Sequence, residues 1–271
     1  MLQTLRSIVY LVKRFLLGRR VLTARIPEFG LTMRVPARDV IGRHLYKYRV
    51  HEPILSQFVS ERLELRPGDV VFDVGANIGW YSLLIGRRVP TGVSMYAFEP
   101  APANYDLLVE NLRRNGISAV TPVQAAVGDK PGRSVLHLYG ESNRGRNSLL
   151  PVHEGLTVEV AVVALDDFCR QHAISQRPIA FLKLDIEGYE YFALKGAAEA
   201  LGRCRAVLVE YSPAFLTAAG VEPTALLDLF SAAGFQPHVV SESGIVSTDL
   251  NALRATTEQI DLLWLPKTPL G

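Results

Sequence analysis

The stretch from Val70 to Gly79, VVFDVGANIG, constrains the fold more than any other part of the chain. Its apolar beginning is typical of a strand covered on both faces, and Gly75 and Gly79 bracket a tight turn before the helix-like segment WYSLLIGRR. A strand that runs through such a turn into a helix leaves backbone N–H groups free at the start of the helix. The stretch therefore predicts an α/β fold with a ligand site on this turn.

Two classes of cofactor compete for the turn. A dinucleotide site follows the pattern Gly-x-Gly-x-x-Gly, but counted from Gly75 the second and third glycine positions hold Asn77 and Trp80. Trp80 is too large for close packing of the helix on the strand, and Asp73 would set a carboxylate beside the diphosphate. S-adenosylmethionine instead carries an ammonium and a sulfonium, which a carboxylate at the strand tip complements. The turn thus favours S-adenosylmethionine.

A second apolar segment, VSMYAFEP at residues 93–100, tests this interpretation. It ends in Glu99, about where an acid accepts hydrogen bonds from both hydroxyls of a ribose. Either adenosine cofactor would use that acid. The combination of Asp73, Glu99 and the Gly-Ala-Asn-Ile-Gly turn is what favours S-adenosylmethionine.

Five segments of the chain, in their order and spacing, resemble the FkbM family of S-adenosylmethionine-dependent methyltransferases. They are FDVGANIGWYSL, FEPAPANYDLLVENLRRN, AAVGD, LKLDIEGYEYFALKGA and VLVEYSP, and the similarity covers roughly residues 45–265. The resemblance implies a Rossmann-like class I methyltransferase fold: α/β, with helices on both faces of a mostly parallel seven-stranded sheet. It also implies methylation of hydroxyls on sugars, polyketides and other acceptors, and it leaves the acceptor open.

The resemblance also implies which residues contact the cofactor. Glu52 matches an acid that the family has just before a helix, which would lie over the methionine end, although an acid at the start of a surface helix explains it equally well. Adenine is expected to be recognised by backbone groups or by Asp129, because Ala125 or Ala126 takes the place of the acid that many enzymes of this fold use. The cofactor-binding set is completed by Asp73, Gly75, Ala76, Asn77, Gly79, Tyr81, Ser82, Glu99, Pro100, Asn104, Ala126 and Asp185.

Carboxylates follow the predicted strands in IAFLKLDIEG and RAVLVEYSP. Ligands of open α/β sheets bind beyond the carboxyl ends of strands where the strand order reverses, so Asp185 is expected to face the transferred methyl group. A hydroxyl acceptor needs a base, for which Asp185 is the first candidate and Glu210 and Glu187 are alternates. The same carboxylates could instead hold Mg²⁺. Structural roles stay open for each, and Glu190 is expected to be a solvated helix residue.

Residues 133–165 interrupt the alternation of strands and helices. RSVLHLYG and LTVEVAVVAL predict an inserted β-hairpin that overhangs the cofactor cleft, with the loop ESNRGRNSLL between its strands. Either this loop is a solvated tip, or it donates hydrogen bonds to a polyhydroxylated or anionic acceptor through Arg144, Arg146, Asn147 and Ser148. Asp166 and Asp167 are expected to cap the next helix. His51 and His153 are fallback bases, although lone histidines are more often structural.

The first 20 residues, MLQTLRSIVYLVKRFLLGRR, contain an apolar stretch that Lys13 and Arg14 interrupt. It is shorter than the ~20 residues that span a bilayer. A signal peptide is not indicated, because the segment lacks a small-residue cleavage site. An amphipathic basic helix is predicted, which would either pack on the domain or a partner, or lie on a membrane surface. Its apolar face consists of Leu5, Ile8, Val9, Val12, Phe15 and Leu16.

Length and composition limit the domain organisation, partners and cellular location that the chain can have. Residues 21–66 are expected to add a hairpin and a helix that pack on the core, and residues 67–271 to form the methyltransferase domain. The formal net charge of +2 argues against a nucleic-acid partner. Cys169 and Cys204 lie far apart, which argues against a disulfide framework or structural zinc and favours a cytoplasmic location, with membrane contact at the inner face as an alternative.

Four functions remain open at this point. The leading hypothesis is O-methylation of a hydroxyl on a sugar, glycolipid or related metabolite with S-adenosylmethionine. The alternatives are N-methylation of a small molecule, an NAD-dependent oxidoreductase, and a non-catalytic scaffold that retains the fold. The oligomeric state, the acceptor and any metal dependence are not predicted.

Overall fold

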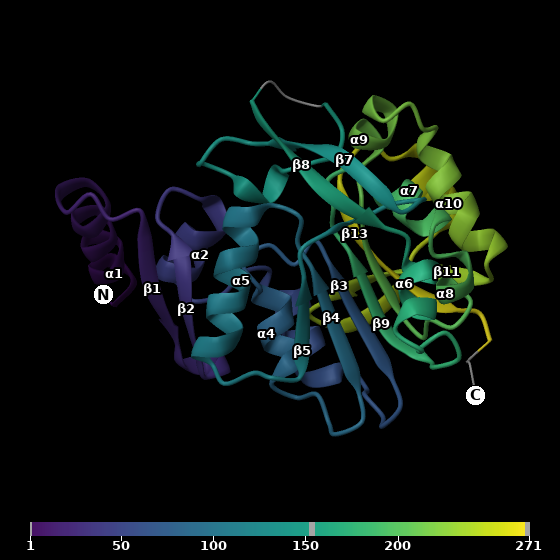
Figure 1. Cartoon of the computed structure of the whole chain (residues 1–271), viewed down its shortest axis with the longest axis horizontal. Coiled ribbons are helices and arrows are strands. Elements are labelled where there is room, and N and C mark those ends of the chain that lie inside the picture. The colour runs from purple at the N-terminus through teal and green to yellow at the C-terminus, as the bar shows by residue number, and fades with distance from the viewer. Residues whose placement is uncertain (1, 152–154, 269–271) are drawn as a thin grey trace.

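The computed structural model describes residues 2–151 and 155–268, and its centre is one eight-stranded sheet (Figure 1). The strands are β3 (Val70–Val74), β4 (Ser94–Phe98), β5 (Val120–Val123), β9 (Ile179–Leu184), β10 (Val207–Tyr211), β11 (Phe235–Ser241), β12 (Gly244–Ser247) and β13 (Ile260–Pro266). Their order is β12-β11-β13-β10-β9-β3-β4-β5. Neighbouring strands from β5 to β10 run parallel, whereas β13 runs antiparallel to β10 and β11. The mostly parallel sheet is confirmed, with an eighth strand because β12 forms an edge hairpin with β11.

Helices cover both faces of this sheet, as expected because β3 and β9 are buried along their whole length (Figure 1). Val71 of β3 belongs to a core shared with α4 (Trp80–Gly86) and α5 (Pro102–Arg114). Successive side chains of a strand point to opposite faces, so Phe72 and Val74 belong to a second core on the other side of the sheet. That second core is built with α6 (Leu165–Gln171), α7 (Glu190–Lys195), α8 (Ala198–Leu201), α9 (Pro213–Ala218), α10 (Pro223–Ala232) and α11 (Leu250–Ala255).

The turn after β3 has little room for side chains. Gly75 has a φ of 80°, and a Cβ there would lie 1.9 Å from the backbone oxygen of Asp185. The carboxyl ends of β3 and β9 therefore approach each other through backbone atoms, which requires glycine. Gly79 has a φ of 90° and precedes α4, so the predicted strand-turn-helix is confirmed.

The segment before β3 packs on the core. Strands β1 (Val21–Ile26) and β2 (Leu31–Pro36) form the expected hairpin, and Met33 and Val35 share a hydrophobic core with α4. The predicted helix after Pro53 divides into α3 (Pro53–Gln57) and the π-helical η3 (Phe58–Arg62). Sequence reasoning missed α2 (Val40–Tyr48), although its N-cap Asp39 is a recognisable start signal and accepts from the N–H of Gly42 at 3.0 Å.

The inserted hairpin belongs to a separate three-stranded sheet. Strand β7 (Gly132–Leu138) pairs antiparallel with β8 (Leu156–Val163), and β6 (Ala126–Val127) pairs with β8 on its other side. Strands β5 and β6 follow each other closely in the chain but lie in different sheets. The predicted capping of α6 is wrong: Asp166 lies inside its first turn and accepts from the N–H groups of Glu199 and Ala200, so it caps α8.

The N-terminal segment forms α1 (Leu2–Leu11), followed by the π-helical η1 (Val12–Leu16). Figure 1 shows α1 at the edge of the molecule, beside β1 and away from the central sheet. Among residues 2–151 and 155–268, no helix has the length and apolarity that crossing a membrane requires. The remaining short 3₁₀ turns are η2 (Pro27–Phe29) and η4 (Arg144–Arg146).

Candidate active site

A cavity lies at the carboxyl ends of β3, β4, β9 and β10, where strand order reverses between β3 and β9. The predicted cofactor residues that line it are Glu52, Gly75, Ala76, Asn77, Tyr81, Glu99, Pro100, Asn104, Ala126 and Asp185. Asp73, Gly79 and Ser82 do not line it, and neither does Asp129. Of the predicted catalytic and acceptor residues, Asp185, Glu187, Glu210, Arg144 and Asn147 line the cavity, whereas Arg146 and Ser148 do not.

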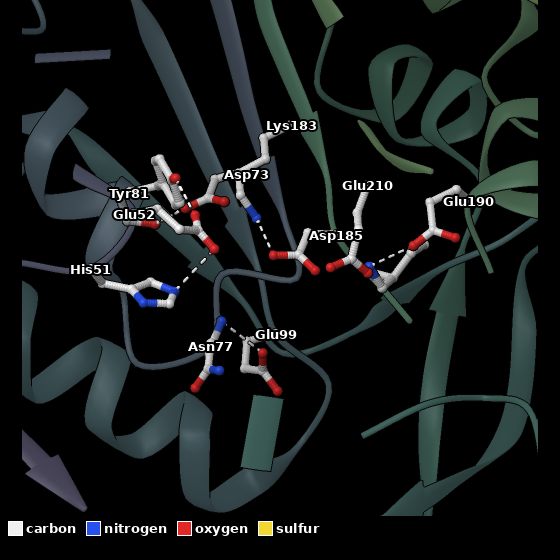
Figure 2. Close-up of polar contacts among 12 residues, drawn as sticks. His51, Glu52, Asp73, Asn77, Tyr81, Glu99, Lys183, Asp185, Glu190 and Glu210 are labelled. Carbon is white, nitrogen blue, oxygen red and sulfur yellow. Dashed lines mark hydrogen bonds and ion pairs between the residues drawn. The ribbon is translucent and has the colours of Figure 1, made fainter. Parts of the chain in front are cut away.

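Glu99 is held in place by backbone donors on both carboxylate oxygens. The N–H of Asn77 donates to Oε2 at 2.8 Å, and the N–H of Ala101 donates to Oε1 at 2.9 Å (Figure 2). Burial raises the pKa of Glu99 to about 7, although the same two N–H groups oppose the rise. Each oxygen keeps a second lone pair, so the carboxylate is positioned to accept further hydrogen bonds from a ligand.

Asn104 of α5 completes this side of the cavity. Its Nδ2 donates to the backbone oxygen of Arg144 at 3.4 Å, which ties α5 to the hairpin loop. Its Oδ1 is buried and has no hydrogen-bond partner. A buried amide oxygen without a partner is costly, so this atom is suited to accept from a bound donor.

Asp73 lies beneath the cavity rather than in its wall. It is 1% exposed, and its Oδ2 accepts from Ser82 Oγ at 2.6 Å. Asp73 is also the register partner of Lys183 on the neighbouring strand β9. Burial raises the pKa of Asp73, while the charge of Lys183 opposes the rise. The carboxylate expected at the strand tip therefore does not line the cavity, and its Oδ1 is buried without a hydrogen-bond partner.

Sequence reasoning missed Lys183, which lines the cavity beside Asp185. Lys183 Nζ donates to Asp185 Oδ2 at 2.8 Å and lies 5.0 Å from the ring centroid of Tyr81 (Figure 2). Burial alone would lower the pKa of Lys183, but the charges of Asp185 and Asp73 raise it. Its signal in the sequence was a single charge inside the buried run IAFLKL, since a buried lysine needs a charged partner.

Glu52 occupies the opposite wall, where its backbone φ is 46°. Its carboxylate accepts from the hydroxyl of Tyr81 and pairs with His51 Nε2 at 3.2 Å. Burial opposes ionisation, but the hydrogen bonds from His51 and Tyr81 prevail and lower the pKa of Glu52 to about 2. Glu52 is thus an ionised acid in the cavity wall, and His51, a fallback base, lines the same wall. His153, the other fallback base, lies outside the described residues.

Asp185, Glu187 and Glu210 converge at the far end of the cavity. One oxygen from each lies within 4.8 Å of the others. Burial, and next the charge of Asp185, raise the pKa of Glu187 to about 8 and that of Glu210 to about 10. One oxygen of Glu187 and one of Glu210 are buried without a partner. This end therefore concentrates acceptors that nothing in the described chain satisfies.

Glu190 is not the solvated residue that the sequence predicts. It is 2% exposed, and its Oε1 accepts from the N–H groups of Ile186 at 2.9 Å and Gly188 at 3.3 Å. Burial raises its pKa to about 7. Glu190 fixes the turn that carries Glu187, which is why a charged helix residue faces inward here.

The hairpin loop covers the cavity together with α2. Asp39 caps α2 and also accepts from the N–H of Arg144 at 2.7 Å, while the N–H of Val40 donates to the oxygen of Ser142 at 3.1 Å. Arg144 and Asn147 line the cavity, so the interpretation of a solvated tip is wrong for these residues. Arg146 points elsewhere, 5.5 Å from the ring centroid of Phe215.

Comparison with known proteins decides the family. The model of the Methyltransferase FkbM domain matches residues 73–237, more than half of the chain. The chain belongs to the FkbM methyltransferase family. This membership makes the protein an enzyme of the methyltransferase class, and the matched range contains Asp73, Glu99, Asp185 and Glu210.

Curated relatives of this FkbM methyltransferase are similar over most of its length. It is 32% identical to 31-O-demethyl-FK506 methyltransferase FkbM of Streptomyces tacrolimicus, over 69% of this chain and 80% of that protein. It is 28% identical to the hexuronic acid methyltransferase AglP of Haloferax volcanii, over 79% of this chain and 82% of that protein. A crystal structure of a methyltransferase FkbM from Methylobacillus flagellatus KT is 23% identical, covers 81% of this chain and 49% of that chain, and has a TM-score of 0.47. This chain thus spans about half the length of that bacterial protein.

Proposed function

We propose that this FkbM methyltransferase uses S-adenosylmethionine to methylate a hydroxyl of a small polyhydroxylated or anionic acceptor. One observation carries the proposal: the unsatisfied buried oxygens in the cavity wall, on Asn104, Glu187 and Glu210, are all acceptors. Such groups require a ligand rich in donors or positive charge. S-adenosylmethionine brings an ammonium, a sulfonium, two ribose hydroxyls and an adenine amino group.

The alternative dinucleotide fits this wall poorly. A diphosphate is anionic and offers acceptors, so it would meet the ionised Glu52 and would bring no donor to the buried oxygens of Asn104, Glu187 and Glu210. The negative charges of the diphosphate and of Glu52 would repel each other and destabilise the complex. The nucleoside of S-adenosylmethionine would be held at Glu99 and Asn104, and its cationic end by the acids around Lys183.

When bound, S-adenosylmethionine supplies a methyl group whose transfer to oxygen follows in-line geometry. The chain's own contribution is to align the acceptor in a cavity that α2 and the hairpin loop cover, and to accept its proton. Lys183 Nζ already donates a hydrogen bond to Oδ2 of Asp185, so that oxygen has a partner. Glu187, with a pKa of about 8 and an unpaired oxygen, is better matched to accept a proton near neutral pH. We therefore favour Glu187 as the base, with Asp185 and Glu210 orienting the acceptor.

Mg²⁺ remains the alternative use of these three carboxylates. Carboxylate oxygens are suitable ligands, but Lys183 already provides Asp185 with a cation at 2.8 Å. The proposal is that Lys183 balances this charge, so that methyl transfer continues at the same rate in the presence of a chelator. A loss of rate that added Mg²⁺ restores would assign the cluster to the metal.

Arg144 and Asn147 support an acceptor with several oxygens. Both line the cavity from the hairpin loop, and an arginine at this place favours hydroxyls or a carboxylate on the acceptor. The relatives named above include a hexuronic acid methyltransferase and one that acts on 31-O-demethyl-FK506. Hexuronic acids and 31-O-demethyl-FK506 are therefore the acceptors to screen first.

The test begins with calorimetric titration of the full chain. S-adenosylhomocysteine is expected to bind and NAD to remain unbound, and Glu99→Ala is expected to weaken the first ligand by at least ~1 kcal/mol through lost hydrogen bonds. Glu159→Ala, on an exposed strand position, serves as the matched control and is expected to bind like wild type. Transfer of a labelled methyl group to hydroxyl-only and amine-only acceptors then separates O-methylation from N-methylation. Binding of neither ligand by the folded protein would refute the proposal, and binding without turnover on any acceptor would favour a scaffold.

A further inference from the structure

The N-terminal helix docks on the protein through its polar side. Tyr10 is 1% exposed and its hydroxyl donates to the backbone oxygen of Ala37. Arg14 donates to the same hydroxyl at 3.0 Å, and Lys47 of α2 lies 4.7 Å from the ring centroid of Tyr10. Tyr46 of α2 packs on Tyr10 with ring centroids 5.8 Å apart, so the contact between α1 and α2 is built on two tyrosines and their cationic neighbours.

The apolar side of the same helix faces away from the protein. Phe15 is 65% exposed and Leu16 is 79% exposed, although amphipathic helices of globular proteins normally turn such residues to the core. The interpretation in which this face packs on the domain is therefore wrong. The exposed large apolar residues of this segment, which we call the N-terminal apolar face, are Leu5, Ile8, Leu11, Val12, Phe15, Leu16 and Leu17.

The π-helical turn extends the N-terminal apolar face. The N–H of Leu17 donates to the oxygen of Val12 at 3.1 Å, five residues back, so one turn holds an additional residue. Phe15, Leu16 and Leu17 are all exposed as a result. Contiguous apolar surface of this kind marks a site of interaction with a partner or a membrane.

The charge around the face identifies the partner. Residues 1–27 contain six basic residues, Arg6, Lys13, Arg14, Arg19, Arg20 and Arg25, and no acidic residue. The rest of the chain has 23 basic and 27 acidic residues, so this segment carries a net positive charge and the rest of the chain a net negative one. An apolar face flanked by Arg and Lys complements a surface that is apolar below and anionic above.

We propose that residues 2–20 bind the surface of an anionic lipid bilayer, with the helix lying in the plane of the membrane. The N-terminal apolar face would enter the headgroup boundary while Arg19 and Arg20, both exposed, contact anionic headgroups. A second copy of the chain is a poorer occupant, because a two-fold contact through this face would bring two basic segments together. The inference is independent of the methyl-transfer proposal, since it requires neither the cavity nor the cofactor.

The experiment is flotation of the full chain with lipid vesicles. The protein is expected to float with vesicles of phosphatidylcholine containing roughly 30% phosphatidylglycerol, less with pure phosphatidylcholine, and less again at high salt. Ile8→Ser, Phe15→Ser and Leu16→Ser, combined, are expected to reduce the partition coefficient at least ~10-fold. Arg19→Gln with Arg20→Gln is expected to reduce it a similar ~10-fold on anionic vesicles only.

A matched control replaces three exposed apolar residues elsewhere. Leu156→Ser, Ile245→Ser and Val246→Ser, combined, remove as many apolar side chains from β8 and β12 and are expected to leave flotation unchanged. Thermal unfolding and S-adenosylhomocysteine binding of each variant verify that the fold is intact. Absence of flotation of the folded wild type on anionic vesicles overturns the proposal. A wild-type dimer that the apolar variant converts to a monomer, measured by sedimentation velocity without lipid, also overturns it and assigns the face to a second copy.

Discussion

Glu99 and Glu187 are carboxylates in the wall of one cavity, yet the chain satisfies them differently. Both oxygens of Glu99 accept from backbone N–H groups at 2.8 and 2.9 Å. Glu187 has a buried oxygen without a partner, as does its neighbour Glu210. Burial raises the pKa of Glu99 to about 7, whereas burial and the charge of Asp185 raise those of Glu187 and Glu210 to about 8 and about 10.

The difference separates a carboxylate that the backbone already holds from carboxylates that keep a buried oxygen without a partner. Glu99 is held by backbone N–H groups of the turn after β3 and of Ala101. The acidic side holds groups whose hydrogen bonds and charges are unbalanced, so a ligand or a reaction can change their protonation. Such a division suits an enzyme that binds a common cofactor by backbone and reacts through side chains.

The largest expected effect comes from the proposed base. Glu187→Gln is expected to reduce kcat by ~10²–10⁴. In wild type the rate should rise with pH up to about 8, because the base must lose its proton, and this rise should vanish in the variant. Methyl-transfer assays between pH 6 and 9 measure kcat and its pH dependence. Glu141→Gln, at an exposed position of the hairpin loop, is the control. An unchanged pH profile in Glu187→Gln would transfer the role to Asp185 or Glu210.

The second prediction concerns how much the buried cation Lys183 contributes to the stability of the fold. Lys183→Met is expected to lower the free energy of unfolding by ~3–5 kcal/mol at pH 7, because Asp73 and Asp185 lose their buried partner. Urea denaturation measures the change. Lys195→Met, on an exposed position of α7, should change stability by less than ~0.5 kcal/mol. A small effect at Lys183 would mean that Asp73 is already neutral in the fold.

Glu190 sharpens the comparison because it is buried like Glu99 and held by backbone donors. Its pKa of about 7 exceeds the ordinary 4.5, so the folded state binds its proton more tightly than the unfolded chain. The stability from this group is complete below pH 4.5 and is lost as pH rises through 7. Glu190→Gln removes the titration, so relative to wild type it should gain up to about 3 kcal/mol between pH 4.5 and 8, measured by urea denaturation. An equal pH dependence in both proteins would contradict this.

The smallest effect concerns the charge of the cofactor. S-adenosylmethionine is a sulfonium and S-adenosylhomocysteine a neutral thioether, so the ratio of their affinities should rise ~10-fold from pH 6 to 9 as the acidic side ionises. Glu187→Gln should reduce this rise, whereas Glu99→Gln should weaken both ligands equally. Calorimetric titration of each protein with both ligands at the two pH values measures the ratios. A rise that survives in Glu187→Gln would exclude Glu187 as its source.

The sequence by itself determined the features that depend on neighbours along the chain. The apolar run of β3, the glycines of its turn and the start of α4 are local, and they predicted the strand-turn-helix that the structure has. Glu99 and Asp185 could be placed because each ends a strand, and the carboxyl ends of parallel strands meet at one edge. The five family segments then fixed the class of enzyme.

Only the tertiary structure decided how distant polar groups satisfy one another. Asp73 was expected to contact a ligand, but strand register places it beside Lys183. Asp39 and Arg144 are 105 residues apart and yet close the cavity with one hydrogen bond, and Glu190 turns inward to hold its own loop. The N-terminal helix has the amphipathic pattern that the sequence predicts, but the contacts of the buried Tyr10 leave its apolar face exposed. Periodicity specifies which side chains share a face, whereas the direction of that face depends on contacts between segments that the chain brings together only when it folds.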